Sequence, residues 1–231
     1  MKSSQVDRQP QRYEPIQSDP YYELNASITK LLKPIGHILR NQSVLDFGCG
    51  ERSFNKFFHD FSIDVIGCDI SQNQSGTVDI VIDATKKILP FKDGNFDAIF
   101  LFDVLEHLPN DAQVLKELNR MLRNEGLLIM SVPFMYRFHE VPNDYRMYTP
   151  SGLAYVLAQA GFYVQEITPI GSSFLVVDTM LRESGSKFTG FWHSIARRLV
   201  LKVLVKFKAI EDPCPVSPLS FFVLAVKRGL A

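Results

Sequence analysis

Two acidic residues lie at the ends of short apolar runs, and their placement predicts a binding site for a nucleoside-type cofactor. Asp46 lies in the run 43–47, just before the turn Gly48-Cys49-Gly50, and Asp69 follows the next apolar run, 63–68. In an open α/β sheet, ligands bind outside the carboxyl ends of the strands. Glycine there lets a ligand approach the backbone, and an acid one strand along accepts hydrogen bonds from ribose hydroxyls.

The glycine turn departs from the dinucleotide-binding fingerprint. A complete G-x-G-x-x-G needs a third glycine at position 53, where the chain has Ser53. That glycine lets the first helix pack close to the strand and face a pyrophosphate. The sequence therefore disfavours NAD or FAD as the cofactor.

More motifs follow in a fixed order along the chain. They are VDIVIDA at 78–84, LPFKDGNFDAI at 89–99, FLFDVLEHL at 100–108 and LNRMLRNEGLL at 118–128. Together with the glycine turn they resemble the class I S-adenosylmethionine-dependent methyltransferases over about residues 43–169 and in a last strand near 219–227. The chain departs from that pattern at Arg52, where the family usually has a third glycine, and at 124–126, where it usually has Pro-Gly-Gly.

The resemblance implies S-adenosyl-L-methionine as the cofactor and gives individual residues a role. Asp46 would organise the loop and the amino-acid end of the cofactor, Asp69 would bind the ribose, and Asp103 would face the methionine and substrate side. The pair Asp83 and Ala84 would recognise the adenine. The full predicted cofactor set is Asp46, Gly48, Cys49, Gly50, Asp69, Ile70, Asp83, Ala84 and Asp103. The alternative is that these aspartates only cap helices and turns, where Asp is common.

Methyl transfer is an in-line displacement that needs alignment and exclusion of water, and it needs a base only where the acceptor must lose a proton. The segment 133–150 resembles a loop of bacterial methyltransferases associated with surface polysaccharides. Within it His139 is the first candidate base, with Asp144 orienting it, and His107 is either a second base or a packing residue. Tyr136, Tyr145 and Arg146 are the predicted substrate contacts. Alternatively, Asp144 and Arg146 pin the loop and His139 takes no part.

Composition narrows the classes of partner. The 231 residues carry 25 basic and 25 acidic side chains, so the sequence predicts no nucleic-acid partner. Its three cysteines show no metal-binding spacing, so we expect reduced thiols and no metal site. The polar N-terminus lacks the apolar core of a signal peptide, and no apolar run approaches the length of a spanning helix, which predicts a cytoplasmic protein.

The elements that must position these residues alternate between strands and helices, typical of a parallel sheet covered on both faces. We expect helices over 21–40 (broken near Pro34), 54–61, 111–123 and 151–160. The expected strands are 43–47, 63–68, 78–82, 96–102, 126–132, 162–168 and 219–227, the last antiparallel. The predicted fold is a Rossmann-like class I methyltransferase sandwich with a mobile arm at 1–20 and a single domain over 21–231.

A helical insertion is expected over about 171–215. Residues 193–210 have a basic amphipathic pattern, with Phe191 and Trp192 beside it. Packing of this helix against the domain is the favoured interpretation. Peripheral contact of 191–210 with the inner membrane surface is the alternative.

The resemblance implies methylation of a small molecule or glycan precursor, with a sugar hydroxyl as the acceptor. The alternatives are a quinone or lipid-like acceptor at the membrane surface and a catalytically silent cofactor-binding protein.

Overall fold

The computed structural model describes residues 11–183, 199 and 217–229 of the chain. Their helices are α1 (Tyr22–Ile38), α2 (Asn55–Asp60), α3 (Asp111–Met121), α4 (Pro150–Gln159) and α5 (Ser173–Glu183), with a 3-10 turn η1 (Leu105–His107). The strands are β1 (Ser43–Phe47), β2 (Asp64–Asp69), β3 (Ile80–Val81), β4 (Phe96–Phe102), β5 (Leu122–Pro133), β6 (Phe162–Ile170) and β7 (Ser220–Lys227).

The seven strands form one sheet in the order β3-β2-β1-β4-β5-β7-β6. Neighbours from β3 to β5 are parallel, whereas β7 runs antiparallel to both β5 and β6. The predicted Rossmann-like fold with an antiparallel last strand is confirmed.

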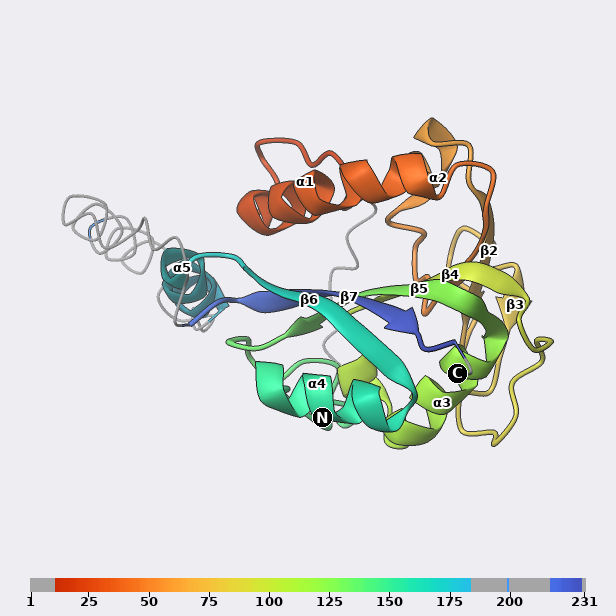
Figure 1. Ribbon diagram of the computed structural model, residues 1–231. Helices are drawn as coiled ribbons and strands as arrows, with labels where there is room; N and C mark the ends of the chain where they lie inside the picture. Colours follow the sequence, from red (N-terminus) through yellow and green to blue (C-terminus); the bar gives the residue numbers. More distant parts are fainter. Residues whose placement is uncertain (1–10, 184–198, 200–216, 230–231) are drawn as a thin grey trace.

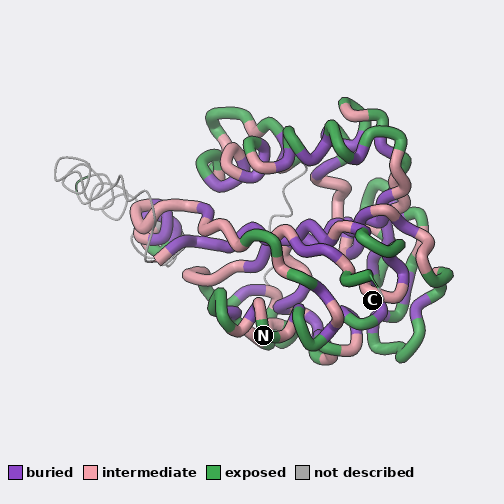
Figure 2. Tube along the Cα trace, in the orientation of Figure 1, coloured by how far each residue is buried: buried purple, intermediate pink, exposed green. Residues whose placement is uncertain are grey.

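Helices cover both faces of the sheet and make three layers (Figure 1). Helices α1 and α2 lie over one face, and α3 and α4 lie under the other. The alternation along β4 explains this layering, because Ile99 and Leu101 belong to the cluster beneath the sheet whereas Phe100 and Phe102 belong to the cluster above it. Buried residues accordingly follow the strands and the inward sides of the helices (Figure 2).

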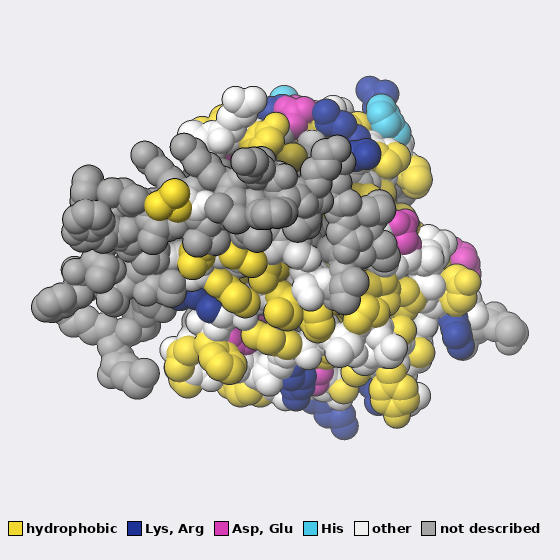
Figure 3. Space-filling model, turned by 90° about the vertical axis from the view of Figure 1, so that its left-hand side faces the viewer, with side chains coloured by type: hydrophobic (Ala, Val, Ile, Leu, Met, Phe, Trp, Pro, Cys, Tyr) yellow, Lys and Arg dark blue, Asp and Glu magenta, His cyan; other side chains and the backbone are white. Residues whose placement is uncertain are grey.

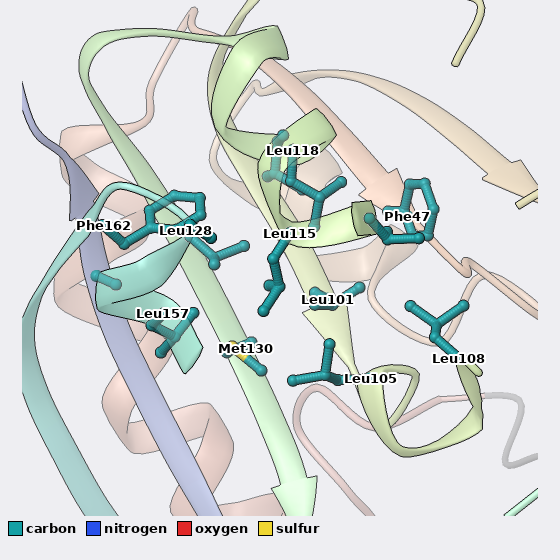
Figure 4. Packing of buried hydrophobic residues seen from close by; sticks show 14 of the residues in the cluster. Phe47, Leu101, Leu105, Leu108, Leu115, Leu118, Leu128, Met130, Leu157 and Phe162 are labelled. Atoms are coloured by element: carbon teal, nitrogen blue, oxygen red, sulfur yellow. The ribbon is translucent and has the colours of Figure 1, made fainter. Parts of the chain in front are cut away.

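The hydrophobic cluster beneath the sheet packs α3 and α4 against the strands (Figure 4). Leu115 and Leu118 of α3 and Leu157 of α4 point toward Leu128 and Met130 of β5, and all five are fully buried. Burying each such side chain contributes about 1.5–3 kcal/mol. The rigid sheet is what holds the loops at its edge in place.

Two expectations about the N-terminal region need correction. Helix α1 continues through Pro34 without a break. The segment 11–20, expected to be part of a mobile arm, packs against the domain, since Tyr13 is buried against Phe57 with ring centroids 5.2 Å apart. A polar segment with prolines thus gains enough contact from one aromatic anchor and from Arg12.

The remaining elements lie near their expected positions. Strand β5 begins at Leu122, because residues 123–126 form an irregularity between the register pairs Phe96–Leu122 and Ala98–Leu127. The proposed basic helix at 193–210 and its flanking Phe191 and Trp192 lie outside the described residues, apart from Leu199. Among the residues described, none belongs to a helix long and apolar enough to cross a membrane.

Candidate active site

A cavity of about 1360 Å³ opens at the carboxyl edge of the parallel strands. The residues after β1, β2, β3 and β4 line one part of it, and the segment after β5 together with residues from 11–25 lines the rest. Figure 3 views the molecule from the left-hand side of Figure 1, the side on which α5 lies, and hydrophobic side chains are prominent among the described residues there. The carboxyl edge of the parallel strands, where the cavity lies, is where open α/β sheets bind their ligands.

The turn after β1 is held in one conformation by neighbouring backbone. The amides of Gly48 and Cys49 both donate to the carbonyl of Cys68, at 2.8 and 3.0 Å. Gly48 has φ +73°, and a Cβ there would lie 2.4 Å from Val104 Cγ2. A side chain at Gly48 would therefore collide with Val104, and the backbone of the turn lines the cavity, where a ligand could approach it.

Arg52, which replaces the family's third glycine, adopts the left-handed conformation with φ +62°. Its guanidinium lies over Gly67 of β2, where a Cβ would come within 1.6 Å of Nη1, and Nη2 pairs with Asp79 at 3.0 Å. Asp79 also accepts from the Gly67 amide at 2.7 Å. Arg52 is therefore folded beneath the turn and is absent from the cavity lining, so it leaves the cavity open.

Asp46 lies at the end of β1 and is 4% exposed. Burial, chiefly, raises the pKa of its carboxyl to about 7, with Asp69 and Asp79 adding to the effect and Arg52 opposing it. Beside it, burial raises the pKa of the Cys49 thiol to about 12 and that of Cys68 well above its usual value, so neither is a thiolate nucleophile.

Asp69 at the tip of β2 ties two loops together. Its Oδ2 accepts from the Gly50 amide at 2.8 Å and its Oδ1 from the Ile70 amide at 2.7 Å. Each carboxylate oxygen has a second lone pair left to accept a ligand hydroxyl. The Ile70 side chain, 65% exposed, lines the cavity next to it and offers an apolar surface for a flat ring.

Asp83 and Ala84 follow β3 on the same rim. Thr85 donates to Asp83 through both its amide and its hydroxyl, at 3.0 and 2.6 Å, and these bonds lower the pKa of the exposed carboxyl. Ala84 is buried, and its carbonyl accepts from Asn110 at 3.2 Å. The acids of β1, β2, β3 and β4 thus share one cavity.

Asp103 after β4 is held by a residue that the sequence did not indicate. It has φ +52°, and its Oδ1 accepts from the Ser131 hydroxyl at 2.6 Å. Its Oδ2 pairs with Arg12 at 2.7 Å, and the Arg12 guanidinium also lies over Phe54 and Phe102. Arg12 lies too far along the chain for any spacing argument to connect it with Asp103.

The two candidate bases meet over a buried acid. The rings of His107 and His139 stand edge to face with centroids 4.6 Å apart. His139 is 9% exposed, and Asp144 accepts from its amide at 2.9 Å and lies 3.2 Å from its Nδ1. Glu106, between the two rings, is fully buried, and burial raises its pKa well above the usual range. The sequence marked Glu106 only as part of a motif.

The predicted substrate contacts separate into two groups. Tyr136 and Tyr145 line the cavity, and the Tyr136 hydroxyl lies 2.9 Å from that of Tyr21. Arg146 and Asp144 are absent from its lining. Arg146 instead donates to the carbonyls of Leu108 and Pro109 at 2.8 and 3.1 Å, which is the loop-pinning arrangement given above as the alternative.

Comparison with known proteins finds similarity to a methyltransferase domain. Residues 45–130, from β1 to β5, match the family model described as a methyltransferase domain. The chain is 28% identical over 184 residues to an uncharacterized protein of Methanocaldococcus jannaschii, covering 73% of this chain and 76% of that protein. It is 27% identical over 167 residues to a probable S-adenosylmethionine-dependent methyltransferase of Mycolicibacterium smegmatis, covering 66% of this chain and 64% of that protein, slightly less than two thirds of its length.

Comparison with solved structures shows that the fold is shared with a known methyltransferase. The crystal structure of a SAM-dependent methyltransferase from Archaeoglobus fulgidus superposes with a TM-score of 0.57 at 19% identity, covering 87% of this chain and 93% of that one. The matched region holds the glycine turn and the acids of β1 to β4, so sequence, fold and site agree. Residues 45–130 thus match a methyltransferase domain, and the sheet around them has the fold of an S-adenosylmethionine-dependent methyltransferase.

Proposed function

We propose that this methyltransferase transfers the methyl group to a hydroxyl oxygen of a small polar acceptor, a sugar or glycan precursor. The observation that carries the proposal is the make-up of the cavity wall formed by the segment after β5. Six polar side chains converge there: Tyr136, Arg137, His139, Glu140, Asn143 and Tyr145. Such a lining suits an acceptor with several hydroxyls, because each one finds a donor or acceptor.

The residues after β1 to β4 that line the cavity fit S-adenosylmethionine in chemistry. Asp69 would accept from the ribose hydroxyls, Ile70 would pack on the adenine, and Asp83 with the Ala84 backbone would bind its edge. The buried Asp46 and the Arg12-paired Asp103 would face the cationic amino-acid end. The cofactor supplies the activated methyl group, and the chain's own residues supply alignment and exclude water.

The assignment of Asp69 to the cofactor ribose is tested by comparing two aspartates of strand β2. Asp64 and Asp69 are the first and last residues of β2, at opposite edges of the sheet. Asp69→Asn should weaken binding of S-adenosylhomocysteine in calorimetry by about 1–3 kcal/mol, since it removes a charged acceptor from ribose. The matched change Asp64→Asn should leave the affinity as it is. Equal affinities for the two variants would refute the ribose assignment.

The acceptor class is tested by product identification. The full chain is incubated with methyl-labelled S-adenosylmethionine and with two panels, nucleotide sugars and free sugars in one, quinols and catechols in the other. A labelled methyl ether on a sugar supports the proposal, and labelled phenolic or N-methyl products would contradict it. Binding of S-adenosylhomocysteine without turnover on either panel or on cell extract would favour the silent cofactor-binding alternative.

An apolar acceptor portion is favoured by one observation. Ile16, which lines the cavity, is 71% exposed. An exposed apolar side chain at the cavity fits an acceptor whose sugar or quinol carries a lipid. A lipid-linked sugar therefore belongs in the first panel.

A further inference from the structure

Glu106, His107 and His139 direct their polar atoms at one point. The carboxylate of Glu106 and one nitrogen of each ring all lie within 4.8 Å of one another. His107 Nε2 is 3.6 Å and His139 Nε2 is 3.9 Å from Glu106 Oε1. Two of these residues are adjacent on η1, and the third comes from the segment after β5.

The central carboxylate lacks any donor. Glu106 is 0% exposed, and neither of its side-chain oxygens has a hydrogen-bond partner among the described residues. Buried carboxylates in proteins are paired with cations, bound to donors or coordinated to metal ions. Glu106 therefore needs either a proton or a positively charged partner at the point that the two rings face.

The outer contacts of both imidazoles decide which nitrogen is available. His107 Nδ1 is 2.7 Å from the carbonyl oxygen of Asn143, which only accepts, so Nδ1 carries the proton. His139 Nδ1 faces Asp144 Oδ2 at 3.2 Å and the carbonyl of Arg137 at 3.3 Å, again acceptors. Both Nε2 atoms then present lone pairs toward Glu106, so a proton or a cation must bind where the three groups meet. A carbonyl or carboxylate behind each imidazole is the arrangement that orients histidine ligands at metal centres.

We propose that Glu106, His107 and His139 bind a divalent first-row transition ion, with Asp144 and the Asn143 carbonyl orienting the two imidazoles. Two imidazole nitrogens and one carboxylate favour zinc, cobalt, manganese or iron over magnesium or calcium, which prefer oxygen. Because the three ligand atoms lie within 4.8 Å of one another, a central point is at most about 2.8 Å from each, so ligand bonds of about 2.0–2.2 Å would require the groups to close by roughly half an ångström.

The position of this site connects it to catalysis, and this step rests on the proposed function. His107 and His139 line the same cavity as the cofactor acids, so an ion held by them would lie at the cavity wall, where an acceptor hydroxyl could reach it. A bound ion would lower the pKa of an acceptor hydroxyl, whose proton leaves to solvent. The oxygen then attacks the methyl carbon, and the carbon–sulfur bond breaks with its electron pair passing to sulfur. The products are the methyl ether and S-adenosylhomocysteine.

The test is metal binding by the full chain, freed of metal with a chelator and titrated with Co²⁺ and with Zn²⁺. We expect one ion per chain, with a visible cobalt absorption band that Zn²⁺ abolishes and millimolar Mg²⁺ does not. His139→Ala and the nearly isosteric Glu106→Gln should each weaken binding at least ~100-fold, and Asp144→Asn about 10–100-fold. His59→Ala removes an imidazole that is 92% exposed and serves as the matched control, with unchanged affinity.

Two results would overturn the proposal. One is no saturable ion binding by the unaltered chain. The other is an ion affinity of folded Glu106→Gln or of folded Asp144→Asn equal to that of His59→Ala. Each of these two results would leave a shared proton as the partner of Glu106. S-adenosylhomocysteine affinity is measured on the same samples. Loss of metal binding with intact cofactor binding concerns this inference alone, whereas a failure to bind S-adenosylhomocysteine would count against the proposed function.

Discussion

Removing the buried charge of Asp46 should make the unbound protein more stable at neutral pH. The carboxyl ionises near 3.8 in the unfolded chain and at about 7 in the folded protein. Between these values the folded state holds one proton more than the unfolded state, so the free energy of unfolding falls by about 1.4 kcal/mol for each pH unit as the pH rises. Integrated over the interval, the loss reaches about 4 kcal/mol.

Asp46→Asn has no such proton to lose. Its free energy of unfolding, relative to that of the unaltered chain, should therefore rise between pH 4 and pH 7 by about 4 kcal/mol and then stay level. Urea unfolding followed by circular dichroism at closely spaced pH values measures this difference directly. Asp64→Asn, at the exposed start of β2, controls for the loss of one negative charge from the domain.

The slope, more than its sign at one pH, tests the reasoning. Asparagine in place of aspartate also changes local hydrogen bonding, but that effect shifts the whole curve by a constant. A difference between variant and unaltered chain that is flat from pH 4 to pH 7 would refute the argument that burial holds the carboxyl of Asp46 neutral. A slope of the opposite sign would mean that Arg52 dominates over burial.

Two further predictions concern the cavity walls. Gly48→Ala should lower the free energy of unfolding by about 1–3 kcal/mol more than Gly94→Ala in urea titrations, because both glycines have positive φ but a Cβ meets Val104 only at Gly48 and nothing at Gly94; equal costs would remove Val104 from the explanation. Arg12→Ala should destabilise the protein by about 1–2 kcal/mol and weaken S-adenosylhomocysteine binding, because it leaves the partly buried Asp103 without its cation. Breaking the exposed pair of Lys33 and Glu14 with Lys33→Ala should change both quantities far less, and an equal loss there would deny Arg12 a role at the cavity.

The fold could be predicted from the sequence because the apolar runs coincide with the buried strands of the sheet. The runs at β1 and β4 were predicted with the bounds that the structure shows, since apolar residues on both faces mark a fully covered strand. The prediction failed where a tertiary contact outweighs a local preference. Pro34 lies inside α1, and Tyr13 holds residues 11–20 in place, although the composition of that segment favours disorder.

The candidate site divides along the same line. Acids at strand tips can be anticipated from the sequence because parallel strands all end at one edge, and the structure does bring Asp46, Asp69, Asp83 and Asp103 to a common cavity. The partners of these acids come from distant segments, so spacing does not reveal them. Arg12 reaches Asp103, and His139 reaches Glu106, only through the fold. Spacing along the sequence therefore does not reveal that Glu106, His107 and His139 meet.

Arg52 shows how a departure from a family motif is accommodated. A left-handed residue with a long side chain would obstruct the cavity if that side chain pointed up from the turn. It instead lies on Gly67 and pairs with Asp79, and Asp79 in turn binds the Gly67 amide. Any side chain at position 67 would displace the guanidinium, so Arg52, Gly67 and Asp79 form one unit. We infer that a glycine at 52 and a larger residue at 67 are tolerated together but that a larger residue at 67 alone is not.

Buried acids at the site also indicate how ligands act on the whole domain. Asp46 and Glu106 are carboxyls held away from water, an arrangement that costs stability until a cation reaches them. The amino-acid end of S-adenosylmethionine and a divalent ion are cations of the kinds that these two positions would accept. Each would bind the folded state alone and would therefore raise its stability by mass action. A site that destabilises the unbound protein is consistent with selection for binding, because the same residues in a purely structural role would be replaced by apolar ones at no cost to the fold.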